Sequence, residues 1–139
     1  MSTFLPEWEP GTVAVLSTGA GPPHAIPVST AVRIGPRTIV LALALRRESL
    51  ARLREDPCCA LTVMAGGNVA LTAHGRAAIV EEPMVVSDRV AAVRIDVDAI
   101  QDHGEDRFEI DDGVSWRWTD PEAEQRDREI RAALSRVTQ

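Results

Sequence analysis

The chain has 139 residues, which is room for one domain of ordinary size and not for two. Hydrophobic residues make up 45% and charged residues 26%, a composition that excludes a disordered or low-complexity chain. The net charge of −6 argues against generic binding to nucleic acid or to a membrane surface, because such binding needs a basic face.

The first residues do not resemble a signal peptide, and no apolar run is long enough for a membrane span. Residues 1–10 have neither the basic stretch nor the apolar core of a signal peptide. The longest apolar run, at residues 39–45, has the length of a strand, whereas a membrane span needs about 18 residues or more. We therefore expect a cytoplasmic protein.

All fifteen basic residues are arginines, and the chain contains no lysine. Schiff-base chemistry, which needs a lysine amine, is therefore excluded. Any anion site must use guanidinium, hydroxyl or backbone N–H groups instead.

Glycine and proline divide the first part of the chain into short extended segments. A compact apolar run at residues 12–18 predicts a first strand. Residues 24–34 continue as a second extended segment, in which Pro27 suggests a sheet edge or a bulge. Residues 38–45 are apolar on both sides, which is typical of a strand covered on both faces.

A short helix is predicted next, at residues 48–56. Leu50 and Leu53 would share one face of it, and Pro57 would end it. Ser49 is a plausible N-cap for this helix.

The second half of the chain predicts a hairpin and a further strand. Residues 58–65 and 69–80 flank Gly66-Gly67, a sequence that favours a two-residue hairpin turn. A strand follows around residues 90–97, and the acidic residues 102–112 predict a loop.

The C-terminal part predicts a short strand at residues 114–118 and a helix at about 120–136. Residues 119–122 (TDPE) fit a capping box with proline in the first turn. Three acid-before-base pairs at i,i+4 spacing support the helix: Glu122/Arg126, Glu124/Arg128 and Asp127/Arg131. Its apolar stripe is thin, so we expect it to dock weakly.

Together these elements predict a mainly β protein of six to seven antiparallel strands forming a small barrel. It has one short helix after the third strand and a C-terminal helix. The short spacing of the turns disfavours a doubly wound sheet. We expect residues 1–139 to form a single domain.

The obvious catalytic motifs are absent from the sequence. It contains no GxSxG, HExxH, GxxxxGK[ST] or GxGxxG. His24, His74 and His103 are too scattered to indicate a metal site. Cys58 and Cys59 are neighbours and would point to opposite faces of a strand, so we interpret them as small buried residues instead of a disulfide.

Residues 43–57 (LALRRESLARLREDP) are the most informative segment, because an apolar strand runs into two arginines and a helix start. A helix N-terminus presents unpaired N–H groups, and Arg46 and Arg47 beside it would complete an anion site suited to phosphate. The residues also fit a simpler interpretation, in which Ser49 only caps the helix and both arginines are solvated or pair with Glu48 and Glu55.

Three segments, in this order, give the chain a family resemblance: residues 21–28 (GPPHAIPV), 47–57 (RESLARLREDP) and 73–77 (AHGRA). Over about residues 10–118 the chain resembles the pyridoxamine 5′-phosphate oxidase-like split-barrel flavoproteins. The resemblance implies a homodimer that binds FMN, or alternatively the deazaflavin coenzyme F-420, in a groove between the subunits.

The resemblance also implies which residues contact the cofactor. The phosphate would lie at the strand-to-helix turn, the ring system along the proline-containing strand, and a C-terminal aromatic over the site, which the partner's residues 68–72 would help to close. The implied residues are Pro27, Val28, Ser29, Thr30, Ala42, Leu43, Arg46, Arg47, Ser49, Leu50, Trp116 and Trp118. The two tryptophans could equally cover the end of the barrel beneath the C-terminal helix.

The chain departs from the family at several positions. Ser49 stands where members commonly carry a lysine, so the phosphate site would depend on Arg46 or Arg47. Ile26 and Ala31 stand where pyridoxamine phosphate oxidases carry arginine and lysine, so we expect no vitamin B6 oxidation.

The sequence therefore predicts a flavin-dependent oxidoreductase that transfers hydride to or from an unknown small molecule. The flavin would carry the chemistry, so no acid–base pair is required of the protein. The alternatives are an F-420-dependent reductase, a non-catalytic protein that binds flavin or haem, and a structural barrel without cofactor.

Overall fold

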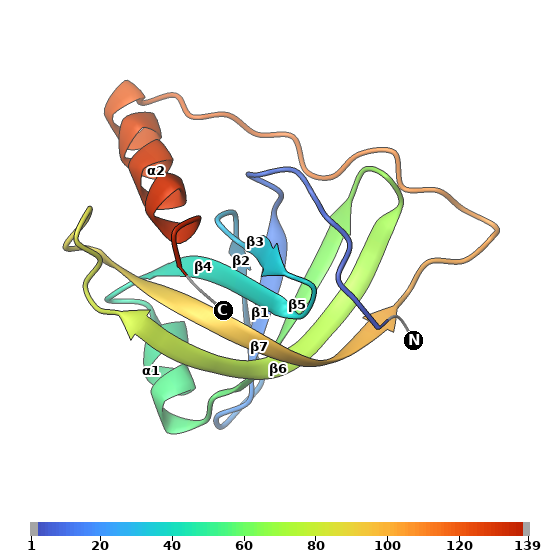
Figure 1. Ribbon diagram of the computed structural model, residues 1–139, viewed down its shortest axis with the longest axis horizontal. Coiled ribbons are helices and arrows are strands. Elements are labelled where there is room, and N and C mark those ends of the chain that lie inside the picture. Colours follow the sequence, from blue (N-terminus) through green and yellow to red (C-terminus); the bar gives the residue numbers. More distant parts are fainter. Residues whose placement is uncertain (1–2, 138–139) are drawn as a thin grey trace.

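Residues 3–137 are described by a computed structural model, in which one curled sheet of seven strands is flanked by two helices (Figure 1). The strands are β1 (Ala14–Thr18), β2 (His24–Val28), β3 (Val32–Gly35), β4 (Thr38–Ala44), β5 (Cys58–Ala65), β6 (Val69–Glu81) and β7 (Val90–Asp102). The helices are α1 (Glu48–Glu55) and α2 (Pro121–Leu134). No helix in the described part of the chain is long and apolar enough to cross a membrane.

The strand order is β2-β1-β5-β6-β7-β4-β3, and every neighbouring pair is antiparallel. The long strands β6 and β7 shift register at His74/Gly75 and again at Ile79/Glu81. Such bulges bend a sheet and increase its twist. A side chain at Gly75 would collide with the carbonyl oxygen of Asp96, so the bend requires glycine at this position. The predicted fold class, a mainly β antiparallel barrel with a short helix and a C-terminal helix, is confirmed.

Strand β4 is covered on both faces, as its apolar composition predicts. Ile39 and Leu41 point into the main core inside the curled sheet, together with Leu50 and Leu53 of α1. Val40 lies on the opposite face, in a second small cluster with residues of α2 that includes the fully buried Leu134.

Four local expectations are wrong. Residues 24–34 are not one strand: the chain leaves the sheet at residues 29–31, so α1 follows the fourth strand and not the third. The turn after β5 contains three residues, 66–68, because Asn68 as well as Gly67 adopts a positive φ. Arg47, and not Ser49, is the N-cap of α1. Residues 114–118 form no strand.

The connection from β7 to α2 is long and extended (Figure 1). It is tied to the β5–β6 turn, where the Asn68 N–H donates to the Ile110 carbonyl at 3.1 Å and the Ile110 N–H donates to the Asn68 side chain at 2.9 Å. The Trp116 indole N–H donates to the Gly11 carbonyl at 2.7 Å. The connection is therefore held by isolated hydrogen bonds and not by the continuous backbone pairing of a sheet, so residues 114–118 form no strand.

Helix α2 begins with a capped first turn that contains proline, as predicted, but Asp120 and not Thr119 is the N-cap. Its carboxylate accepts from the Glu122 N–H at 3.0 Å. Two of the three predicted ion pairs are present: Glu124–Arg128 at 3.1 Å and Asp127–Arg131 at 2.6 Å.

Candidate functional site

A cleft lies between the end of β2 and the end of β4, and we call it the β2–β4 cleft. Its volume is about 160 Å³. It is lined by Ile26, Pro27, Val28, Ser29, Thr30, Ala42, Leu43, Ala44 and Arg47. Seven of these nine residues are among the twelve for which the family resemblance implies cofactor contact, so the fold brings together residues up to 20 positions apart.

The β2 side of the cleft is shaped by the chain leaving the sheet. Strand β2 is an edge strand, which accommodates Pro27 because no further strand needs its missing N–H. The Thr30 hydroxyl then bridges to β4: it accepts from the Ala42 N–H at 2.9 Å and lies 3.3 Å from the Ala42 carbonyl. This contact fixes residues 29–31 against β4 and sets the width of the cleft.

Arg47 supplies the positive charge of the cleft. It is the N-cap of α1, and its N–H donates to the Ala44 carbonyl at 3.0 Å, which turns the chain sharply from β4 into the helix. The side chain is exposed and makes no hydrogen bond or ion pair within residues 3–137. A guanidinium without an internal partner at a helix N-terminus is suited to hold an anion.

The start of α1 is braced by a chain of polar contacts, which we call the His24 brace. His24 Nε2 lies 3.0 Å from the Ser49 hydroxyl, and His24 Nδ1 lies 3.2 Å from Glu48 Oε2. Glu48 in turn accepts from Arg52 Nε at 2.7 Å. The guanidinium of Arg52 holds the pKa of the Glu48 carboxyl below its ordinary value.

This acid–imidazole–hydroxyl order resembles that of a hydrolase triad, but burial excludes that role. Ser49 is 0% exposed and does not line the β2–β4 cleft, so no substrate can reach its hydroxyl. The contacts tie α1 to β2 instead. Because Arg47 directly precedes Glu48 and Ser49, the His24 brace positions Arg47 beside the cleft.

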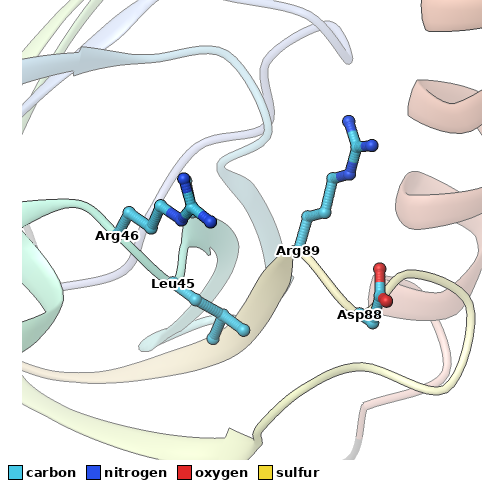
Figure 2. A pocket seen from close by; sticks show the side chains of 5 residues that line it. Leu45, Arg46, Asp88 and Arg89 are labelled. Atoms are coloured by element: carbon cyan, nitrogen blue, oxygen red, sulfur yellow. The ribbon is translucent and has the colours of Figure 1, made fainter.

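Five of the residues implied by the family resemblance lie outside the cleft. Ser49 and Leu50 are fully buried, Ser49 against His24 and Leu50 in the main core, since the first turn of α1 faces inward. Arg46 lines a separate cavity of about 740 Å³, together with Ala44, Leu45, Asp88 and Arg89 (Figure 2).

Trp116 and Trp118 also lie outside the β2–β4 cleft. Their rings pack edge to face, with centroids 5.4 Å apart and an interplanar angle of 81°. The Trp118 indole N–H donates to Asp127 of α2 at 3.3 Å, and Trp116 reaches Gly11. Within one chain, the tryptophans therefore pack against the N-terminal segment and α2, and neither lines the β2–β4 cleft.

Sequence reasoning missed Ile26 and Ala44 in the cleft and Arg89 in the neighbouring cavity. The first two are adjacent to implied residues and could have been included from their place on the strands. Arg89 follows β6 by several residues and carries no local signal. Within residues 3–137, no group of three or more histidine, cysteine, aspartate or glutamate side chains is placed to hold a metal ion.

No family model and no curated protein matches the chain. Solved structures do match it. A candidate pyridoxamine 5′-phosphate oxidase from Listeria innocua is 16% identical, with a TM-score of 0.55 over 66% of this chain and 88% of that chain. An F420 reductase is 12% identical, with a TM-score of 0.57 over 73% and 98%. A FAD-binding protein from Mesorhizobium loti is 14% identical, with a TM-score of 0.53 over 64% and 83%.

These identities are low, and the likeness lies in the arrangement of the strands around the core. It agrees with the resemblance carried by residues 21–28, 47–57 and 73–77. The chain has the split-barrel fold of the pyridoxamine 5′-phosphate oxidase-like proteins.

Proposed function

We propose that the chain binds a phosphorylated flavin at the β2–β4 cleft and acts as an oxidoreductase on a small molecule. The observation that carries this proposal is the cleft itself. Apolar side chains of β2 and β4, two hydroxyl residues and a guanidinium without an internal partner line one concave surface. That combination fits a planar, largely apolar ring with a phosphate at the end of its side chain.

Different residues of the cleft would contact different parts of the flavin. Arg47 would hold the phosphate, and Pro27 and Ala42, which are less buried than Val28 and Leu43, would contact the apolar part of the ligand. The Thr30–Ala42 bridge would keep the two walls at a fixed separation. When bound, a flavin supplies the hydride chemistry.

None of the nine residues that line the cleft is an aspartate, glutamate or histidine, so these side chains provide no general acid or base. This composition is compatible with flavin chemistry, because the cofactor carries the reaction. It equally fits a flavin-binding protein without turnover. Haem fits less well: the cleft lining contains no histidine, cysteine or methionine to ligate iron, and His24 is engaged in the His24 brace.

We further propose a homodimer with the cofactor at the subunit interface. The cleft volume of about 160 Å³ lies below the range of about 300–1,000 Å³ that small-molecule sites occupy. A flavin would therefore project from the cleft, and a second chain could cover the projecting part. Trp116 and Trp118 are each 40% exposed, which leaves aromatic surface available for such a contact.

Fluorescence titration with FMN, riboflavin and F-420 tests the cofactor assignment. We expect wild-type protein to prefer FMN or F-420 over riboflavin, because only the first two carry a phosphate. Arg47→Gln should weaken FMN binding about tenfold, the loss expected for one exposed charge-assisted hydrogen bond, and should remove the preference over riboflavin.

The matched control is Arg107→Gln, since Arg107 is exposed, lies outside the cleft and makes no ion pair within the described residues. It should leave FMN affinity unchanged. Equal affinity of the wild-type protein for FMN and riboflavin, or an equal loss in both variants, would contradict the assignment of Arg47.

A further inference from the structure

The cavity that contains Arg46, which we call the Arg46–Arg89 pocket, is formed where β4 ends and β7 begins. The antiparallel register of these strands ends at the Ala44–Val90 pair. The Leu45 N–H donates to the Arg89 carbonyl at 2.9 Å and continues the ladder by one step. Arg46 and Arg89 therefore leave the sheet at the same end, although 43 positions separate them in the chain.

Both guanidinium groups are available to a ligand. Figure 2 shows the Arg46 and Arg89 side chains extending to the same side of this sheet end. Both residues are exposed, and neither guanidinium makes a hydrogen bond or ion pair with any residue between 3 and 137. Asp88 also lines the pocket, yet it forms no ion pair with Arg89 within that range.

Two like charges that face one cavity repel each other, and an anion between them would relieve the repulsion. A concave surface with an excess of one charge also raises the local concentration of the opposite charge. This effect is notable in a chain whose net charge is −6, because the surface as a whole disfavours anions. Carboxylates and phosphates are the groups that guanidinium forks bind best.

The pocket adjoins the β2–β4 cleft. Ala44 lines both cavities, and the consecutive residues Arg46 and Arg47 diverge, one into each. Ala44 and Leu45 add apolar surface beside the arginines, against which a carbon skeleton could lie. A ligand in the pocket would therefore lie directly beside a cofactor in the cleft.

We infer that the Arg46–Arg89 pocket binds the carboxylate or phosphate group of a small organic anion that is separate from the cofactor. Taking that anion to be the substrate rests on the proposed function; the binding site itself does not. Asp88 weakens anion binding by its own negative charge and favours a ligand that also carries a hydrogen-bond donor.

The first test is a titration of cofactor-free protein, in which the arginine Nε–H signals are followed by NMR at low ionic strength. The probes are inorganic phosphate and succinate, which distinguish a phosphate site from a carboxylate site. Saturable shifts of the Arg46 and Arg89 signals are expected with at least one probe. Arg46→Gln or Arg89→Gln should weaken the apparent affinity about tenfold, as expected for the loss of one charge-assisted hydrogen bond.

Two further variants separate a built site from a general charge effect. Asp88→Asn should tighten binding of the same probe, and Arg107→Gln should leave it unchanged. A loss in Arg107→Gln equal to that in Arg46→Gln, or shifts that never saturate, would overturn the inference. All four substitutions are at exposed positions, and a thermal melt of each variant confirms that it is folded.

The outcome is separable from that of the proposed function. Arg47→Gln should impair FMN binding while the probe still binds at Arg46 and Arg89. In wild-type protein saturated with FMN, the probe should still bind. Competition between FMN and the probe would instead assign the pocket to the cofactor's own phosphate and would overturn the inference of a separate ligand.

Discussion

The His24 brace can be tested through the coupling between His24 and Ser49. The Ser49 hydroxyl is fully buried and has His24 as its partner at 3.0 Å, so Ser49→Ala removes one internal hydrogen bond, which is worth about 1 kcal/mol of unfolding free energy. His24→Ala leaves the buried hydroxyl without that partner and should cost about 1–3 kcal/mol. In the double variant no polar atom is orphaned, so its cost should fall below the sum of the single costs by about 1 kcal/mol.

Urea denaturation at neutral pH measures these free energies. With a slope of about 1–3 kcal/mol per molar urea, a change of about 1 kcal/mol moves the midpoint by about 0.3–1 M, which is readily resolved. Strictly additive costs would refute the coupling, because they would show that the two side chains stabilise the fold independently.

The same variants test whether the His24 brace positions Arg47. Ser49→Ala should weaken FMN binding as well as stability, because the start of α1 is released. Thr62→Val is the matched control: it removes a hydroxyl contact of the same length, 3.0 Å to Thr72, on strands that do not line the cleft. It should lower stability and leave FMN affinity unchanged. A loss of stability without any loss of affinity in Ser49→Ala would limit the brace to a structural role.

Three further predictions follow from burial and charge. The folded-state pKa of the Glu48 carboxyl is lowered, mainly by Arg52, so the ionised carboxylate stabilises the fold above its ordinary pKa of 4.5, and this stabilisation is lost as the pH falls through the folded-state pKa. Glu48→Gln should therefore reduce the loss of unfolding free energy that acid causes, which a pH series of denaturation curves measures. Burial raises the pKa of the Cys59 thiol to about 12, whereas Cys58 is exposed, contrary to the expectation from sequence; a thiol reagent should therefore modify one cysteine in native protein and both after denaturation. Leu134→Ala should lower the unfolding free energy by about 2–5 kcal/mol in a thermal or urea melt, because this side chain of α2 is fully buried in a cluster with Val40 of β4. A change under about 0.5 kcal/mol would contradict that packing.

Local patterns were sufficient to predict most of the secondary structure. The double-sided apolar pattern of residues 38–45 corresponds to β4, with the main core on one face and α2 on the other. The helical spacing of Leu50 and Leu53 corresponds to α1. Periodicity succeeds here because burial on one or two faces is a property of the segment itself. It failed at residues 29–31 and 114–118, where partner strands, or their absence, decide whether an extended segment joins the sheet.

The candidate cleft was predicted in part, and mainly through the family resemblance. That resemblance implied residues 27–30, 42–43 and 47, which lie at strand ends and at a strand-to-helix turn. Of these, Arg47 was also indicated by the local pattern, in which an apolar strand runs into two arginines and a helix start. What these residues bind stays a prediction, as do the dimer and the roles of the tryptophans.

Only the tertiary structure decided where individual side chains point and which distant residues they meet. Ser49 is turned inward to His24, 25 positions away, and so is unavailable to a ligand. Arg46 and its neighbour Arg47 enter different cavities, and the β4–β7 register brings Arg89 to Arg46. The composition and spacing of the chain determine which segments become strands and helices, because those depend on each segment's own pattern of burial. Strand register, bulges and the packing of the helix ends determine the sites, because they set contacts between residues that are far apart in the sequence.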